Sequence, residues 1–192
     1  MKSFVIGLSL TLFTVPALAS EQASRPLASP QARTERVDAL FADLKRARTP
    51  EAAERVAGRI REEWQRSGSA SVDLMMRWAG EAMAEDRNDV ALDFLDQLVV
   101  VAPDYAEAWN RRATLHYMTG DTGKSLVDIE RTLRIEPRHF GALSGMAQIL
   151  KDAGHPERAL EAYLRVLDIY PQLRSAQDEA GSLADEIAGE GI

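Results

Sequence analysis

Side chains that commonly bind metals or perform catalysis are scarce in this 192-residue chain, which has three histidines and no cysteine. His139 and His155 flank one predicted helix of about 15 residues, and a rise of about 1.5 Å per residue separates them by more than ~20 Å. Two histidines so far apart cannot share a metal ion. The sequence also contains no HExxH, CxxC, glycine-rich phosphate loop or nucleophile elbow. We therefore expect no metal site, no cofactor and no enzymatic activity.

The charge of the chain limits the class of binding partner. It has 30 acidic and 23 basic residues, which give a formal net charge of −7. An acidic protein of this kind is not expected to bind nucleic acid or an anionic membrane surface as its main partner. The sequence therefore favours a protein or a peptide as the partner.

The spacing of prolines indicates the architecture. Prolines recur at intervals of 34 residues, at Pro103, Pro137 and Pro171. Small residues keep the same interval, at Ala91, Ser125 and Ala159. A fixed period of this length is typical of stacked copies of one supersecondary unit. We assign three units, residues 72–105, 106–139 and 140–173.

Each unit is predicted to be a pair of helices. Two stretches with helical apolar periodicity are separated by a short polar break, and no strand is predicted. Asn88 lies at one of these breaks, and Asp121 and Thr122 lie at another. The side chain of Asn88, and that of either Asp121 or Thr122, can cap the next helix, and Pro156 suits a first helical turn. The closing prolines disfavour helix in the residue before them, so the second helix of each unit ends there.

These units resemble the tetratricopeptide repeat (TPR), a helix–turn–helix of the same length. Trp109 fills the early aromatic position, and alanines fill the eighth position of each unit, at Ala79, Ala113 and Ala147. The resemblance covers roughly residues 73–171 and implies an all-α, TPR-type solenoid, a right-handed superhelix of antiparallel helix pairs. Residues 102–115 and 136–145 are also similar to one exported bacterial group of TPR proteins with no assigned biochemical role.

The resemblance also implies a binding surface, because one stripe of each first helix lines a concave groove in that family. The partner-binding candidates on this stripe and beside it are Met76, Arg77, Met83, Asn110, Arg111, Thr114, Tyr117, Ser144, Gln148 and Lys151. The amide of Asn110 can pair with an extended peptide backbone.

Several of these candidates have a structural alternative. Met76 and Met83 either form an adaptable apolar wall or belong to the core. Tyr117 either stacks on a ligand or packs against the next unit. The lysine, arginine and asparagine clamp with which some family members hold a C-terminal carboxylate is not reproduced. Arg77 or Arg111 would instead bind a ligand carboxylate through two parallel hydrogen bonds. The alternative is that both arginines are solvated surface residues.

Arg112 lies on the core stripe, where the family prefers leucine. A buried guanidinium needs an acidic or carbonyl partner. The candidates are Glu81, Asp128, Glu130 and Glu136. The alternatives are a structural ion pair and a catalytic or ligand-binding arginine.

The two ends of the chain differ from the repeats. Residues 1–19 are predicted to be a cleavable signal peptide, with one charge at Lys2, a short apolar core and small residues before Ser20. Its removal would leave a net charge of −8. Residues 20–33 are predicted to be a disordered lead-in. Residues 34–71 form a degenerate helix pair that serves as a first unit, and residues 172–192 form a C-terminal capping helix, which makes nine helices in one solenoid.

The sequence thus predicts a non-catalytic scaffold of the bacterial periplasm, which presents a concave TPR groove to a protein or peptide partner. It is not expected to insert into the membrane after signal cleavage, and a monomer is favoured. The alternative is a structural or self-assembling subunit of an envelope complex, acting through its convex face or its ends.

Overall fold

The structure, a computed structural model, describes residues 30–190, and over this range it consists of nine α-helices without a strand. The helices are α1 (Pro30–Arg46), α2 (Pro50–Gln65), α3 (Ala70–Ala84), α4 (Asn88–Val101), α5 (Ala106–Met118), α6 (Thr122–Ile135), α7 (Phe140–Asp152), α8 (Pro156–Ile169) and α9 (Arg174–Glu190). None of them is long and apolar enough to cross a membrane. The predicted signal peptide, residues 1–19, and residues 20–29 of the predicted lead-in lie outside the described residues.

Helices α3 to α8 form three antiparallel pairs, each closed by a turn in the same left-handed conformation. The turn residues are Asp86, Gly120 and Gly154, which are 34 residues apart and have φ values of 56°, 84° and 72°. Glycine adopts such φ values without steric cost, and aspartate tolerates them better than most residues. The repeat period is therefore present in the backbone conformation as well as in the prolines.

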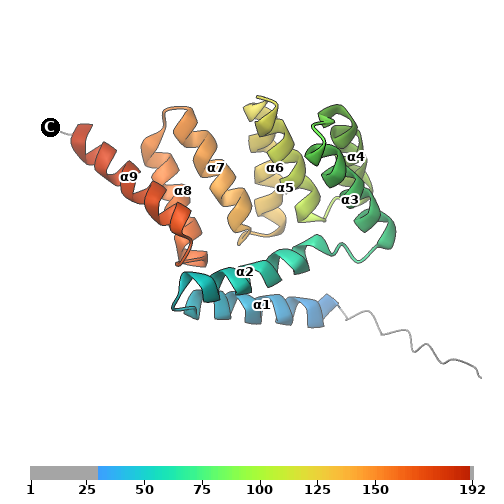
Figure 1. Cartoon of the computed structure of the whole chain (residues 1–192), viewed down its shortest axis with the longest axis horizontal. Helices are drawn as coiled ribbons and strands as arrows, with labels where there is room; N and C mark the ends of the chain where they lie inside the picture. The colour runs from blue at the N-terminus through green and yellow to red at the C-terminus, as the bar shows by residue number, and fades with distance from the viewer. Residues whose placement is uncertain (1–29, 191–192) are drawn as a thin grey trace, which may run out of the picture.

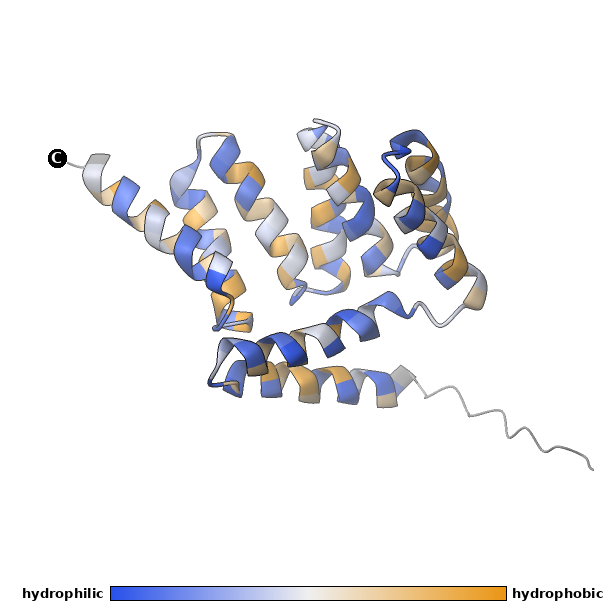
Figure 2. Ribbon diagram, in the orientation of Figure 1, coloured by the Kyte–Doolittle hydropathy of each residue, from blue (hydrophilic) through white to orange (hydrophobic). Residues whose placement is uncertain are grey.

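The three pairs stack in a row and curve toward one layer of helices (Figure 1). Within each pair the two helices are in close contact, and α4 contacts α5 as α6 contacts α7. Helices α5 and α7 also contact each other, whereas no contact of similar extent joins α4, α6 and α8 in the described chain. The first helices of the pairs, α3, α5 and α7, form one layer, which we call inner, and α4, α6 and α8 form the other, which we call outer. Each helix is amphipathic, with hydrophobic and hydrophilic residues interleaved along it (Figure 2).

The predicted helix starts are confirmed at two places and wrong at one. Asp121 accepts from the backbone N–H of Lys124, and Pro156 is in the first turn of α8. At the start of α2, the Thr49 side chain likewise accepts from the backbone N–H of Ala52, before Pro50. Asn88 is not a cap. It is already the first helical residue of α4, because Arg87 takes the cap position, and its Oδ1 atom is buried without a hydrogen-bond donor.

The N-terminal helix pair does not stack as a first unit, which corrects the prediction of one solenoid of nine helices. Helices α1 and α2 lie along one edge of the row, where the loops between repeats are (Figure 1). There α1 contacts α8 and α2 contacts α5. Helix α1 also begins at Pro30, inside the segment predicted to be disordered, and the Arg33 guanidinium donates to the carbonyl of Glu63 at 2.6 Å.

Aromatic packing fastens this pair to the third repeat. The ring of Trp64, at the end of α2, stacks on His139 with centroids 4.1 Å apart and lies 4.9 Å from Phe140. The Tyr170 hydroxyl donates to Glu54 of α2 at 2.9 Å. The pair and the third repeat consequently share one hydrophobic core, which also includes residues of α9. A chain segment far from this repeat in sequence thus completes its core.

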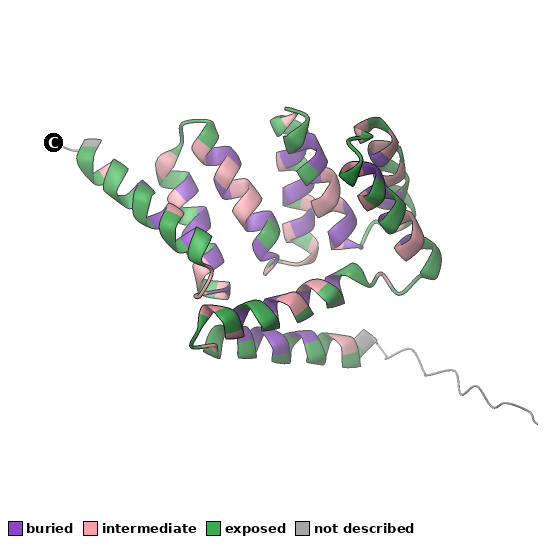
Figure 3. Ribbon diagram, viewed as in Figure 1, coloured by how far each residue is buried: buried purple, intermediate pink, exposed green. Residues whose placement is uncertain are grey.

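Helix α9 packs on α8, the last helix of the third repeat, and ends the row of helices there. Ala176, Ala180 and Leu183 are buried there, and Leu173 and Ile187 are half-buried. The remainder of α9 is mostly exposed (Figure 3). This polar outer side separates the core of the last repeat from solvent, as a terminal unit of a solenoid must.

We predict that Trp64→Ala destabilises the protein by about 3–5 kcal/mol, because it removes a buried aromatic side chain from the shared core. For a chain of this length that corresponds to about 2–4 °C in Tm for each kcal/mol. Trp78→Ala is the matched control, since Trp78 is 43% exposed and should cost much less. Differential scanning calorimetry measures both, and equal losses would mean that α2 is not held by Trp64.

Candidate functional site

The predicted groove residues lie on the three inner helices. Arg77 and Met83 are on α3, and Ser144, Gln148 and Lys151 are on α7. Between them, α5 carries four candidates, Asn110, Arg111, Thr114 and Tyr117. All of these side chains are exposed or half-buried. We call this set the inner strip.

Met76 does not belong to the inner strip, which corrects its assignment as a groove residue. It is 5% exposed and packs in the core of the first repeat with Ala79 and Leu95. Of the two alternatives for Met76, the structure shows the core position. Met83 is half-buried at the edge of the same core.

Arg111 and Asn110 are both tied to a glutamate that the sequence did not single out. Arg111 Nη2 donates to Glu107 Oε1 at 3.1 Å, and the Asn110 amide donates to Glu107 Oε2 at 3.4 Å. Arg111 also lies over Gly80 of α3, where a Cβ atom would approach its Nη1 atom to 3.0 Å. The absence of a side chain at Gly80 therefore makes room for the guanidinium.

Glu107 is the centre of a buried junction between α5, α7 and α2. The backbone N–H of Ala142 donates to His139 Nδ1 at 3.1 Å, so the ring proton is on Nε2 and can donate to Glu107 Oε2 at 3.3 Å. The indole ring of Trp64 stacks on the face of the same imidazole. We call Trp64, Glu107 and His139 the central joint.

The charge state of Glu107 depends on these neighbours. Burial raises the pKa of a carboxyl group, but the hydrogen bonds from His139 and Arg111 and the charge of Arg111 outweigh that effect. The pKa of Glu107 is consequently held below its ordinary value, and the side chain is ionised in the folded protein at neutral pH.

The α7 end of the inner strip is already engaged in contacts between neighbouring units. The Tyr117 hydroxyl donates to Asp152 Oδ2 at 2.7 Å, and Gln148 donates to Asp152 Oδ1 at 2.7 Å. Lys151 pairs with Glu179 of α9 at 2.5 Å. Of the two alternatives for Tyr117, the structure shows contact with the next repeat, although its ring remains 37% exposed.

The α3 end of the strip keeps unused binding capacity. Arg77 is exposed and makes no hydrogen bond or ion pair with a residue of the described chain. The Asn110 side-chain oxygen accepts no hydrogen bond there either, so a donor and an acceptor are available on adjacent helices. Over residues 30–190, no three histidine, aspartate or glutamate side chains are grouped as metal ligands.

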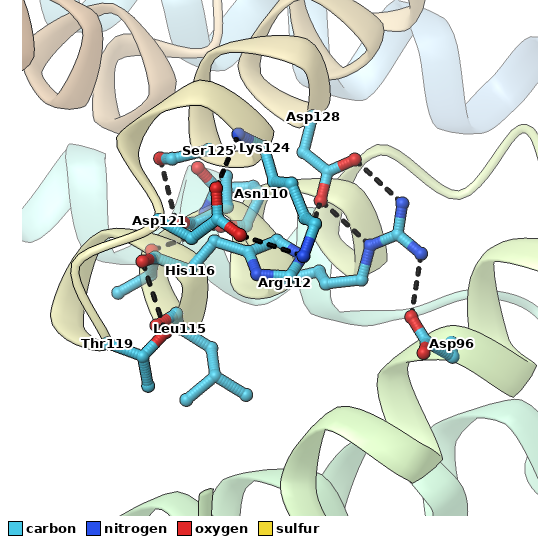
Figure 4. Close-up of polar contacts among 12 residues, drawn as sticks. Asp96, Asn110, Arg112, Leu115, His116, Thr119, Asp121, Lys124, Ser125 and Asp128 are labelled. Atoms are coloured by element: carbon cyan, nitrogen blue, oxygen red, sulfur yellow. Dashed lines mark hydrogen bonds and ion pairs between the residues drawn. The ribbon is translucent and has the colours of Figure 1, made fainter. Parts of the chain in front are cut away.

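Arg112 is held by acids, as one of its alternatives predicted. Its Nε and Nη2 atoms both bind the Asp128 carboxylate at 2.7 Å, and Nη1 binds Asp96 at 2.8 Å (Figure 4). The guanidinium also lies 4.9 Å from the centre of the Trp109 ring. Asp128 was among the predicted partners, and Asp96 was not. Because the guanidinium nitrogens bind Asp128 and Asp96 and one face of the group lies over Trp109, Arg112 has a structural role.

Sequence reasoning missed the central joint because its members belong to three different elements. Glu107 and Trp64 were given no functional role, and His139 was considered only as a metal ligand. The position of His139 just before Phe140, the first residue of α7, is the one local signal, since a side chain there can cap the helix.

A sequence relative supports the repeat assignment directly. The chain is 54% identical to a "TPR repeat-containing protein" of Rhizobium etli over 155 residues, which cover 81% of this chain and 76% of the relative. No protein-family model matches the sequence.

Solved structures share the fold at low sequence identity. The first TPR domain of Spaghetti bound to an HSP90 peptide superposes with a TM-score of 0.58 at 16% identity, over 61% of this chain and 93% of that one. The complex of the TPR2B domain of yeast Sti1 with an Hsp70 peptide gives 0.57 at 13% identity, over 62% and 99%. At such identities the likeness concerns the fold alone.

We predict that Arg112→Ala costs about 3–5 kcal/mol, because it leaves the carboxylate of Asp128, which is 2% exposed, without its bidentate partner. Replacing both partners, as in Arg112→Leu with Asp128→Leu, should recover most of this loss. Arg158→Ala, at an exposed arginine of α8, is the control. Chemical denaturation measures all three, and a double variant weaker than Arg112→Ala would contradict the ion-pair account.

The lowered pKa of Glu107 predicts a specific pH dependence of stability. Because the carboxyl binds a proton less readily folded than unfolded, its contribution is complete above the ordinary value of 4.5 and is lost as the pH falls through the folded pKa. Glu107→Gln should flatten this acid limb, whereas Glu81→Gln, on an exposed residue, should not. Melting temperatures between pH 7 and about pH 3 provide the comparison.

Proposed function

Because the chain belongs to the TPR-repeat proteins, we propose that it is a non-catalytic scaffold that binds a protein or peptide partner on the inner strip. Two structurally similar TPR domains hold peptides, one from HSP90 and one from Hsp70. Their folds, but not their ligands, are carried over to this chain.

The observation that supports this proposal is the unequal use of polar groups along the inner strip. At the α7 end, the Tyr117 hydroxyl donates to Asp152 of α7 and the Lys151 ammonium donates to Glu179 of α9. At the α3 end, Arg77 forms no hydrogen bond or ion pair in the described chain, and Met83 is a half-buried apolar residue of the same helix. A partner segment with an acidic group near an apolar side chain suits this end.

The place of action is part of the proposal and rests on the sequence. Residues 1–19 have the charge, apolar core and small residues before Ser20 of a cleavable secretory signal. We infer export to the periplasm, and a chain that acts there as a monomer.

Photocross-linking in the native host tests partner, surface and location together. A benzoylphenylalanine at Arg77 should capture one defined protein, and the adduct should be in the periplasmic fraction. The matched controls are Val127 and Leu164, which are 64% and 53% exposed on outer helices and should give no adduct. Once the partner is identified, Arg77→Ala should make its binding free energy about 1–3 kcal/mol less favourable without changing the Tm of the protein. Arg111→Ala is a poorer test, since it also removes a partner of the buried Glu107.

A second candidate function is self-assembly or membership of an envelope complex through the outer layer. It is favoured by the exposure of large apolar residues on the outer helices, namely Val100, Val101, Val127 and Leu164. Adducts from Val127 or Leu164 but not from Arg77, together with an oligomer in light scattering, would favour this function over the groove.

A further inference from the structure

We propose that the protein has a second binding site, a cleft between the N-terminal helix pair and the loops that end the first two repeats, and that this cleft takes an acidic peptide segment. The cleft has a volume of about 1040 Å³ and is lined by α1, α2, residues 102–106 and residues 135–138. None of its lining residues belongs to the inner strip, so this site is distinct from the groove of the proposed function.

A surplus of guanidinium groups lies at one side of the cleft. Arg36 Nε and Arg66 Nη1 both contact the same oxygen of Glu63, at 3.2 and 2.9 Å, and Arg33 Nη2 donates to the Glu63 backbone carbonyl at 2.6 Å. Two guanidinium groups thus share one carboxylate, whose side chain is 9% exposed, and a third binds the backbone of the same residue. Each guanidinium has five N–H donors, so most of their donors are not used by Glu63.

The other charges of the lining are matched and do not cancel this surplus. Arg138 binds both Asp38 and Glu136, at 2.8 and 3.3 Å. Asp104 is paired with Arg131 at 3.8 Å. The unmatched charge of the cleft is therefore positive, although the whole chain has a net charge of −7.

Trp64 gives an independent sign that an acceptor is missing. It lines the cleft, and its indole Nε1–H is buried with no hydrogen-bond acceptor in the described chain. Buried donors without a partner are rare and cost free energy, and an indole nitrogen can only donate. A carboxylate or carbonyl oxygen is the kind of group that such a donor requires.

The walls of the cleft favour a peptide over a nucleic acid or an inorganic anion. Val37, Pro103 and Ile135 line it together with the arginines, so apolar side chains and carboxylates can be held side by side. Its size is at the upper end of the range for ligand sites, roughly 300–1,000 Å³, which suits several residues of an extended segment.

Fluorescence anisotropy with the protein purified from its host tests the proposal. The probe is a fluorescein-labelled octapeptide of alternating aspartate and leucine, and its reference has asparagine in place of aspartate. Arg66→Gln should weaken binding of the probe about tenfold, which corresponds to the loss of one charge-assisted contact. Glu63→Gln should tighten it several-fold, because a competing carboxylate is removed.

The two variants disturb the same ion pair, so structural damage alone would shift affinity in one direction. Opposite shifts would support the cleft, and shifts of the same sign would overturn it. Arg158→Gln, on an exposed arginine of α8, should leave the affinity unchanged.

Two further variants distinguish other occupants and other sites. If Arg77→Ala weakens the probe and Arg66→Gln does not, the acidic peptide binds the inner strip and the cleft proposal fails. If Glu21→Gln tightens binding as Glu63→Gln does, the cleft belongs to the N-terminal segment of the chain itself, whose one acid before residue 30 is Glu21. Equal affinity for the aspartate and asparagine peptides would also contradict a charge-selective cleft.

Discussion

The arrangement of the helices depends on one imidazole, that of His139. Its Nδ1 atom accepts from the first turn of α7, its Nε2–H donates to Glu107 of α5, and its ring face stacks on Trp64 of α2. Two consecutive repeats and the N-terminal pair therefore meet at one side chain. Since these groups are buried, a displacement of α5 or α7 would leave a polar group without a partner, at a cost of about 1–3 kcal/mol, and a displacement of α2 would remove the stacking of Trp64. The joint thus specifies where the edge helices lie, beyond what apolar packing requires.

Charged side chains in the repeats largely form ion pairs with one another within the protein. Arg111 and Arg112 are adjacent in sequence but turn to different sides of α5. Arg111 binds Glu107 and covers Gly80, and Arg112 binds Asp128 and Asp96 on the outer helices. Such pairs use much of the hydrogen-bonding capacity of the middle repeat. Within the described residues, capacity remains at the Asn110 side-chain oxygen, at Arg77 and at the arginines around Glu63.

This distribution has a functional consequence for a repeat protein. A regular solenoid presents similar surfaces from every unit, but here the N-terminal pair closes one edge of the row and creates a cleft that the repeats alone would lack. The inner strip depends on the spacing of α3 and α5, whereas the cleft depends on how α1 and α2 are docked. The two proposed sites can therefore be altered independently, although the central joint contributes to both, through Glu107 beside Arg111 and through Trp64 in the cleft wall.

The sequence by itself determined the all-α repeat and its period of 34 residues. These features are local: prolines end helices, small residues permit close packing, and the left-handed turn recurs at Asp86, Gly120 and Gly154. It also placed Asp128 among four candidate partners of Arg112, and the structure selects it. Only the tertiary structure decided that Met76 is core and that α1 and α2 cross the edge of the row. An amphipathic pattern says which side of a helix must be covered but not what covers it, and contacts such as Trp64 with His139 join residues too far apart in sequence for any local preference to specify.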